Sequence, residues 1–242
     1  KLDSNGILNI INFDKYEYDT KIKLKNFEKF IDRQSMARFL VRYELFKKIK
    51  KVKGSIVECG VHYGGGIMAW AKLSSSLEPY AIHRKIIGFD TFDGFPGLSK
   101  EDKISVNHGE LKRKGFQSHN MILEELKECI EEYNQNRFLN QFNKIELIKG
   151  DANLTIPKYV EDNSHLIVAL LFLDFDIYQP TKTALEIFLK RMPKGGIIVF
   201  DEINNEYWKG ETTAALEVFK SFNNLEIKKF EFDPNIAYIT IK

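Results

Sequence analysis

The spacing of apolar residues divides the chain into two parts. Across residues 26–50, apolar side chains recur mostly at steps of three and four, which is the period of an amphipathic helix or helix pair. From residue 55 onward, short β-rich apolar runs alternate with stretches of helical period. The runs that predict parallel strands lie at residues 55–59, 85–90, 144–150, 166–174 and 195–202.

This alternation predicts an α/β fold, namely a doubly wound, Rossmann-like sheet that is mostly parallel and has helices on both faces. The last two apolar runs, residues 225–232 and 236–242, flank an Asp-Pro-Asn turn signal, so we expect an antiparallel hairpin at one edge of the sheet. We expect an N-terminal helical cap or extension over residues 1–50 and a single structural unit over residues 51–242.

Composition excludes several classes of partner. With 242 residues, 43% of them hydrophobic, the chain fits one large domain with one sizeable core. Lys and Arg (36) nearly balance Asp and Glu (34), so charge gives no reason to expect nucleic acid or an anionic membrane as a partner. The longest apolar run, residues 166–173, is far shorter than the roughly 18 to 20 residues that span a bilayer, so we expect a soluble protein.

The expected compartment follows from the cysteines and the first residues. Cys59 and Cys129 form no CxxC motif, which indicates neither a disulfide framework nor a zinc site. The first ten residues lack the order of regions found in a signal peptide. We therefore expect a cytoplasmic protein, and the sequence leaves open whether it is a homo-oligomer.

A glycine-rich turn follows the first predicted strand. The segment IVECGVHYGGG, residues 56–66, continues from the strand through Gly60, Gly64, Gly65 and Gly66. Glycines permit close backbone approach, and the next helix offers free N–H groups to an anion or carboxylate. The alternative is a tight turn without a ligand. A dinucleotide site is disfavoured, because the spacing is G-x-x-x-G-G-G and the next strand-end acid, Asp90, lies thirty residues after Gly60 instead of about twenty.

Two acids end the predicted strands that follow. Asp90 is placed to accept hydrogen bonds from both hydroxyls of a ribose, beside the aromatic residues Phe92 and Phe95. The alternative is an exposed loop residue. We expect Asp90 to govern ligand affinity and to add little to the stability of the unliganded fold. Asp151 is placed to accept a hydrogen bond from an exocyclic amine such as that of adenine.

The densest group of carboxylates lies in LDFDIYQPT and FDE. Asp174 and Asp201 end two predicted strands, Glu202 follows directly, and Asp176 adds a further acid, with no Lys or Arg next to any of them in sequence. Unpaired buried carboxylates repel one another, so their convergence indicates a divalent cation or a shared proton. Ligation by oxygen alone favours Mg²⁺ or Ca²⁺ over zinc. Helix N-caps and solvated turns are the alternative, above all for Asp176.

A long polar segment, residues 98–120, has the poor periodicity and length of a lid. We expect it to close over the ligands together with the helix around residues 33–42. His62 in the glycine turn and His108 and His119 in the polar segment are candidate general bases, with a surface position as the alternative.

Together, the segments VECGVHYGGG, IIGFDTFDGFPG, KGDA and LDFDIYQPTKTALEIFLKRMPKGGIIVFDE resemble the macrocin O-methyltransferase family (TylF/MycF type) over about residues 30–220. The resemblance implies a class I S-adenosylmethionine-dependent methyltransferase fold. It also implies methylation of a sugar hydroxyl on a nucleotide-linked deoxysugar, a glycosylated natural product or a glycan, commonly with Mg²⁺. The rival hypotheses are a Rossmann-type oxidoreductase that uses NAD(P) and a catalytically silent donor-binding protein.

The same resemblance implies roles for individual residues. The glycine turn would hold the amino-acid portion of the donor, Asp90 the ribose and Asp151 the adenine. The residues assigned to the donor site are Glu58, Cys59, Gly60, Tyr63, Gly64, Gly65, Asp90, Thr91, Phe92, Asp151 and Ala152. The metal is assigned to Asp174, Asp201 and Glu202, and Glu202 departs from the family pattern by replacing the usual second Asp. Asp174 is the first candidate for the proton acceptor, ahead of Asp176 and His119.

Overall fold

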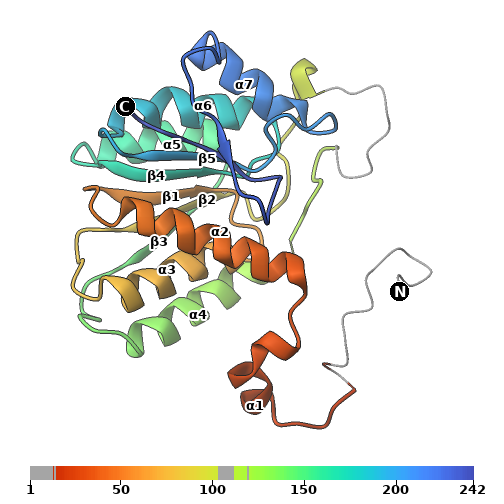
Figure 1. The fold of residues 1–242 in the computed structure, drawn as a ribbon, viewed down its shortest axis with the longest axis vertical. Coiled ribbons are helices and arrows are strands. Elements are labelled where there is room, and N and C mark those ends of the chain that lie inside the picture. Colours follow the sequence, from red (N-terminus) through yellow and green to blue (C-terminus); the bar gives the residue numbers. More distant parts are fainter. Residues whose placement is uncertain (1–12, 14, 103–111, 119) are drawn as a thin grey trace.

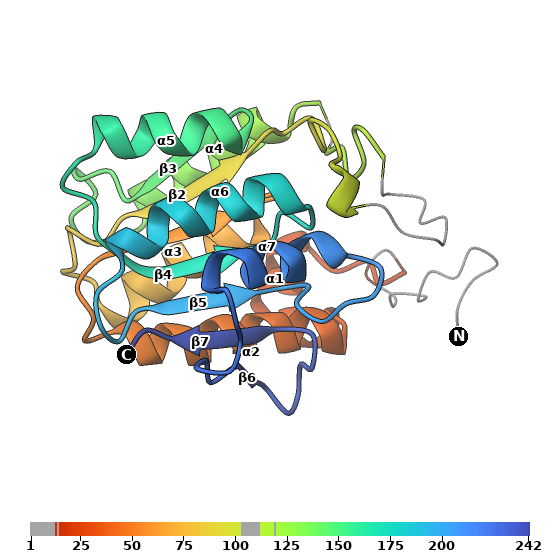
Figure 2. The same cartoon turned by 90° about the horizontal axis from the view of Figure 1, so that it is seen from above.

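The computed structural model describes residue 13 and residues 15–102, 112–118 and 120–242. Its centre is a seven-stranded sheet in the order β3-β2-β1-β4-β5-β7-β6 (Figure 1 and Figure 2). The strands are β1 Ser55–Cys59, β2 Ile86–Asp90, β3 Ile145–Lys149, β4 Val168–Leu173, β5 Ile197–Phe200, β6 Lys228–Lys229 and β7 Ala237–Thr240. Strands β1 to β5 are parallel, whereas β7 pairs antiparallel with both β5 and β6. The predicted parallel sheet with a C-terminal antiparallel hairpin is confirmed.

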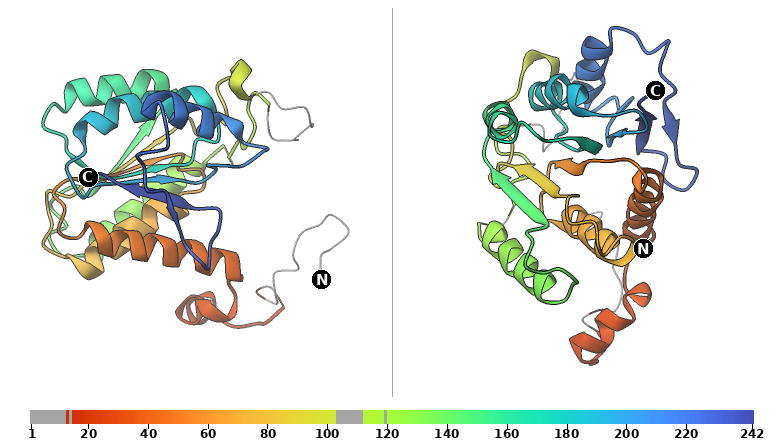
Figure 3. Two further views of the ribbon diagram at one scale, coloured as in Figure 1. Left: turned by 45° about the horizontal axis from the view of Figure 1, so that its top comes forward. Right: turned by 90° about the vertical axis from the view of Figure 1, so that its left-hand side faces the viewer.

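Helices cover both faces of this sheet, as the alternating pattern predicted. Helices α2, α3 and α4 lie on one face and α5, α6 and α7 on the other, while α1 stands apart from the sheet (Figure 1 and Figure 3). The α-helices are α1 Thr20–Lys25, α2 Arg33–Ile49, α3 Gly65–Leu77, α4 Ile122–Gln135, α5 Ala152–Asp162, α6 Tyr178–Phe188 and α7 Lys209–Phe219. Short 3₁₀ helices span Phe27–Lys29, Lys100–Asp102 and Leu189–Arg191. In the described ranges, no helix is both long enough and apolar enough to cross a membrane.

Each face of the sheet has its own hydrophobic core, because successive residues of a strand point to opposite sides. Ile56 of β1 packs in the core beneath α2, α3 and α4, and the next residue, Val57, packs in the core beneath α5, α6 and α7. Every residue of β1 and β4 is buried. Burial on both faces explains why these strands are apolar runs without alternation.

Helix α2 belongs to the first of these cores. The side chain of Asp32 caps the helix by accepting a hydrogen bond from the N–H of Ser35 (2.7 Å). Val41, Leu45 and Phe46 from its second half are almost completely buried against the sheet. The domain boundary at residue 50 stays a prediction, but α2 contributes to the same core as the residues that follow it.

The residues that follow the strands are held in register at the carboxyl edge of the sheet. Backbone hydrogen bonds extend the ladder one residue beyond the strand ends. They run from the N–H of Gly60 to the carbonyl of Phe89 (2.9 Å), from Asp174 to Cys59 (2.8 Å), from Gly150 to Asp90 (2.9 Å) and from Asp201 to Leu173 (3.2 Å). From β1 the chain adds β2 and β3 on one side and then β4 and β5 on the other, so the strand order switches between β1 and β4. Ligands of open α/β sheets bind outside the carboxyl ends of the strands at such a switch point.

Lys144 lies at the opposite, amino edge of the sheet, directly before β3, and only 6% of it is exposed. Its ammonium donates to the carbonyl of Ala81 (2.6 Å), and burial lowers the pKa of Lys144 from 10.5 to about 8. Between these two values the unfolded chain binds a proton that the folded chain has lost. The contribution of Lys144 to the free energy of unfolding therefore rises with pH between about 8 and 10.5.

We expect the unfolding free energy of the wild-type protein to rise relative to that of Lys144→Met by about 1 kcal/mol per pH unit above pH 8. Urea denaturation of both proteins at three pH values between 8 and 10.5 measures this difference. Lys158→Met is the matched control, because the Lys158 side chain is 77% exposed, and it should follow the wild-type slope. Parallel curves for wild type and Lys144→Met would contradict the prediction.

Candidate active site

A cavity of about 250 Å³ lies at the carboxyl edge of the sheet, and the loops that follow β1 to β5 line it. The residues predicted for the donor site that line it are Gly60, Asp90, Thr91, Asp151 and Ala152. The acids predicted for metal binding or proton transfer also line it, namely Asp174, Asp176, Asp201 and Glu202. The structure thus brings the two predicted halves of the site into one cavity.

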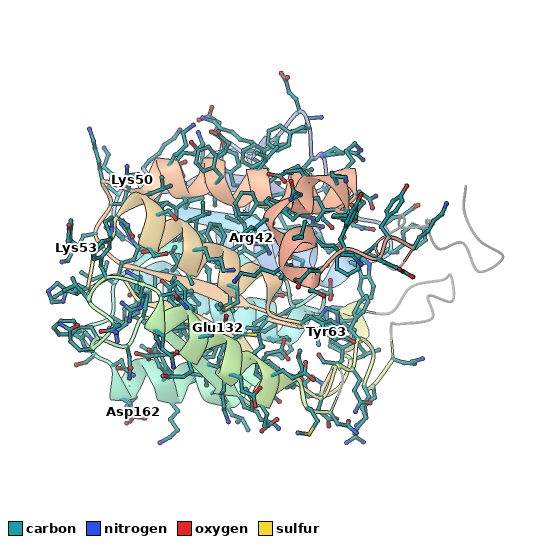
Figure 4. The ribbon with its side chains drawn as sticks, turned by 90° about the horizontal axis from the view of Figure 1, so that it is seen from below. Arg42, Lys50, Lys53, Tyr63, Glu132 and Asp162 are labelled. Atoms are coloured by element: carbon teal, nitrogen blue, oxygen red, sulfur yellow. The ribbon has the colours of Figure 1, made fainter. Side chains whose placement is uncertain are left out.

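Other residues predicted for the donor site do not line the cavity. They are Glu58, Cys59, Tyr63, Gly64, Gly65 and Phe92. Glu58 and Cys59 belong to β1, whose residues are all buried, so their side chains face the cores. Tyr63 is 56% exposed and lies at the surface beside α3 (Figure 4). His119 and residues 103–111 of the predicted lid, which include His108, lie outside the described residues.

The glycines of the turn make room for this chain's own atoms. Gly60 has a φ of +92°, and a Cβ there would lie 2.0 Å from the carbonyl oxygen of Asp174. Gly64 has a φ of +82°, and its Cβ would lie 2.0 Å from Cδ2 of Leu126 on α4. A Cβ at Gly66 would lie 1.9 Å from Oε1 of Glu58, whereas one at Gly65 would meet nothing within 4 Å. Of these glycines, Gly60 lines the cavity.

A buried ion pair supports the turn from below. Glu58 is 1% exposed, and its Oε1 lies 3.3 Å from Nη2 of Arg42 on α2. The Arg42 guanidinium also lies over the rings of Phe172 (5.0 Å) and Trp70 (5.8 Å), between α2 and α3 (Figure 4). Burial raises the pKa of Glu58, and the charge of Arg42 opposes that shift. Glu58 therefore supports the turn from within the core, through its ion pair with Arg42 and its contact with Gly66, and does not line the cavity.

Asp90 ties the turns after β1 and β2 together. Its Oδ2 accepts hydrogen bonds from the N–H groups of Val61 (2.7 Å) and His62 (2.8 Å), and its Oδ1 accepts one from Phe92 (2.6 Å). A carboxylate offers about four acceptor positions, so three backbone bonds leave room for one further donor. Three backbone hydrogen bonds make Asp90 part of the fold as well, so we now expect it to add to the stability of the unliganded protein. Its role in binding the ribose stays a prediction.

We expect Asp90→Ala to lower the unfolding free energy of the unliganded protein by about 2 kcal/mol, since it leaves three N–H groups without their acceptor. It should also weaken binding of the methyl donor by about tenfold or more. Urea denaturation and calorimetry measure the two effects. Asp162→Ala, whose side chain is 59% exposed at the end of α5, serves as the control. An unchanged stability for Asp90→Ala would show that the turns keep their structure without this carboxylate.

The acids at the ends of β4 and β5 form an electronegative group. Burial and the negative charges of their neighbours raise the pKa of both Asp174 and Asp176 well above the usual range, and raise the pKa of Glu202 to about 7. Glu211, in the first turn of α7, is fully buried behind them, and its Oε1 accepts a hydrogen bond from the N–H of Glu202 (2.9 Å). Glu211 was not identified from the sequence as part of this group, because it lies on α7, in the helix after the loop that carries Glu202.

Arg38 of α2 supplies the positive charge that the sequence around these acids lacks. Its guanidinium forms an ion pair with both oxygens of Asp201, and its Nε lies 3.6 Å from Oδ2 of Asp233. Across the described ranges, no group of three or more His, Cys, Asp or Glu side chains is arranged closely enough to hold a metal ion. Metal binding by Asp174, Asp201 and Glu202 therefore stays a prediction that requires side-chain movement.

Aromatic side chains close one side of the cavity. Phe95, Phe116 and Trp208 line it, with ring centroids 5.8 Å apart for Phe95 and Phe116 and 5.6 Å apart for Phe116 and Trp208. Two backbone hydrogen bonds link the segments that carry Phe95 and Phe116, from Phe95 N–H to Gly115 O (3.1 Å) and from Lys114 N–H to Phe95 O (2.9 Å). The part of the polar segment around Gly115 and Phe116 is thereby held beside the cavity.

The family model for macrocin-O-methyltransferase (TylF) matches residues 30–239 of the chain. The chain belongs to this family. The match confirms the resemblance seen in the sequence, and with the structural relatives it makes the protein an O-methyltransferase, which replaces the oxidoreductase hypothesis. Among curated protein sequences, none matches the chain.

Solved structures of O-methyltransferases share its fold. The crystal structure of CalS11, a calicheamicin methyltransferase, is similar with a TM-score of 0.89 and 29% identity, covering 94% of this chain and 87% of that chain. The apo structure of CalS11, described as a TDP-rhamnose 3′-O-methyltransferase, gives a TM-score of 0.80 and 27% identity, covering 94% and 88%. The O-methyltransferase NovP, with a TM-score of 0.62 and 16% identity over 85% and 80%, is similar in fold.

Proposed function

We propose that this TylF-family enzyme transfers a methyl group from S-adenosylmethionine to a sugar hydroxyl of a nucleotide-linked deoxysugar or a glycosylated small molecule, with Mg²⁺ as cofactor. One observation carries the proposal. A single cavity is lined by Gly60, Asp90 and Asp151 on one side and by the acids after β4 and β5 on the other. The activity named for CalS11, a structural relative at 27% identity, supports a sugar as the acceptor.

The donor half fits S-adenosylmethionine in its chemistry. Asp90 keeps one acceptor position for a ribose hydroxyl, and Asp151, whose Oδ1 accepts the N–H of Asn153 (2.9 Å), keeps Oδ2 for an amine. The backbone of Gly60 lines the cavity without a side chain. These groups would bind the ribose, adenine and amino-acid portions of the donor, respectively.

The acidic half fits Mg²⁺ in its donor set. Asp174, Asp201 and Glu202 offer oxygen ligands alone. Burial first, and the charge of Asp201 second, raise the pKa of Asp174 and Glu202, and a divalent cation would oppose both effects. Asp174 and Asp201 directly follow the neighbouring strands β4 and β5, and the N–H of Asp201 donates to the carbonyl of Leu173 (3.2 Å). These three residues would hold the metal.

When bound, S-adenosylmethionine supplies an electrophilic methyl group, and Mg²⁺ supplies Lewis acidity that makes a coordinated hydroxyl more acidic. The chain's own residues align the acceptor oxygen, exclude water and accept the proton. The aromatic side chains of Phe95, Phe116 and Trp208 cover the cavity. Asp174 is the first candidate for the proton acceptor in this proposal, because it lines the cavity at the end of β4 beside the other acids.

The test incubates purified protein with labelled S-adenosylmethionine and a panel of TDP-, UDP- and GDP-linked deoxysugars, with Mg²⁺ or with EDTA. We expect labelled methyl on at least one sugar nucleotide, and reversible loss of transfer in EDTA. Failure to bind S-adenosylmethionine in calorimetry would overturn the proposal. Donor binding without transfer to any sugar nucleotide would shift the acceptor to glycosylated small molecules, and no transfer to those either would favour the donor-binding protein.

A further inference from the structure

Arg38 carries a positive charge from α2 into the group of acids at the carboxyl edge. Its Nη1 donates to Oδ1 of Asp201 and its Nη2 to Oδ2 (3.3 Å), so the guanidinium occupies both oxygens of that carboxylate. The side chain of Asp201 is 7% exposed and that of Arg38 is 32% exposed. In this ion pair, the carboxylate of Asp201 is shielded from solvent, whereas the Arg38 side chain is partly exposed.

The same carboxylate is a metal ligand in the proposed function. A planar guanidinium that bonds both oxygens of Asp201 takes two of the about four acceptor positions of that carboxylate and leaves fewer for a cation. A divalent cation at that carboxylate would also face a like charge at contact distance in a partly shielded site, where repulsion is strong. Arg38 and the cation therefore compete for Asp201, through the acceptor positions that Arg38 takes and through the repulsion of their charges.

Asp233 gives Arg38 a second partner outside the metal ligands. It lies in the turn before β7, and its side chain is 8% exposed. Its Oδ1 accepts the N–H of Asn235 (3.3 Å), while its Oδ2 lies 3.6 Å from Nε of Arg38. A rotation of the Arg38 side chain towards Asp233 would keep its charge paired after it leaves Asp201. Helix α2 itself need not move, because Val41 and Leu45 hold it in the core.

We propose that Arg38 is an internal competitor for the cation: it pairs with Asp201 when no metal is bound and moves to Asp233 when a divalent cation takes Asp201. This inference rests on the metal requirement of the proposed function. It has two consequences. The acids at the strand ends keep a counter-ion in the metal-free protein, and the affinity for the cation is lower than the ligands alone would give.

The test measures Mn²⁺ binding to the purified protein without donor or acceptor, by calorimetry and by the electron paramagnetic resonance signal of free Mn²⁺. Arg38→Met removes the charge and keeps an unbranched side chain, and Arg33→Met makes the same change at an exposed position of the same helix. We expect Arg38→Met to bind Mn²⁺ more tightly than wild type by about tenfold or more, and Arg33→Met to stay within about twofold.

Two further variants keep the test decisive if Arg38→Met does not fold, which circular dichroism would report. Arg38→Lys keeps the charge and loses the fork that bonds both oxygens, so it should bind Mn²⁺ more tightly than wild type and less tightly than Arg38→Met. Asp233→Asn removes the second partner, so Arg38 should stay at Asp201 and Mn²⁺ binding should weaken.

Equal or weaker Mn²⁺ binding by the Arg38 variants would overturn the proposal, while a wild-type enzyme that still requires the metal would leave the proposed function intact. Methyl transfer that persists in EDTA, with no Mn²⁺ bound by any variant, would refute the metal requirement and the competition together. If the wild-type protein binds Mn²⁺ weakly and Arg38→Met binds it more tightly, the result would support the proposal.

Discussion

Asp201→Asn lowers kcat by about two orders of magnitude or more, in keeping with the several kcal/mol that Lewis-acid activation contributes. The amide removes the charge of a metal ligand, and it also removes the partner that Arg38 holds with two hydrogen bonds. Steady-state kinetics with saturating donor and acceptor measure the effect. Donor affinity in calorimetry should stay near the wild-type value, because Gly60, Asp90 and Asp151 follow other strands.

Asp162→Asn is the matched control for this substitution. Helix α5 begins at the carboxyl edge of the sheet, and Asp162 is its last residue, at the other end. The side chain of Asp162 is 59% exposed. Its kcat should lie within about threefold of wild type, as for surface changes away from a site. Full activity of the wild-type enzyme in excess EDTA would show that the metal assignment is wrong, and Asp174 would then act as a general base without a cation.

Gly66→Ala should destabilise the protein by about 3 kcal/mol, because the new Cβ would displace a buried ion pair. That Cβ would lie 1.9 Å from Oε1 of Glu58 and 2.5 Å from Nη2 of Arg42. Neither group has open space, since the Glu58 and Arg42 side chains are 2% and 12% exposed. Urea denaturation measures the loss.

The neighbouring glycine provides the control. A Cβ at Gly65 meets nothing within 4 Å, and alanine favours the helix that begins there, so Gly65→Ala should be neutral or stabilising by up to about 1 kcal/mol. Equal unfolding free energies for the two variants would mean that the Glu58–Arg42 pair shifts without cost. Packing against this pair would then not explain why residue 66 is a glycine.

The sequence predicted those parts of the site that depend on strand ends. Parallel strands deliver their carboxyl ends to one edge, so Asp90, Asp151, Asp174 and Asp201 could be placed in one cavity from their positions after apolar runs. The same reasoning placed Gly60 at the turn after β1. Local patterns were sufficient because each residue follows directly from the strand that precedes it.

Contacts between distant segments were beyond that reasoning. Arg38 reaches Asp201 across 163 positions, and only the rotation of α2 on the sheet decides which of its side chains faces the acids. The glycine run was interpreted as room for a ligand, yet at Gly64 and Gly66 the space is taken by Leu126 and Glu58. The burial of Glu58 follows from its place within β1, where both faces are covered.

The hydrogen bonds that prolong the sheet beyond its strands limit how this enzyme can change. Gly60, Gly150, Asp174 and Asp201 each donate a backbone hydrogen bond to a neighbouring strand, so their main chain shares the rigidity of the sheet. Phe116 and Trp208, by contrast, are carried by connecting segments outside the strands. New acceptor preferences are therefore best sought by varying those segments, in directed evolution as in natural divergence, while the ladder residues are left untouched.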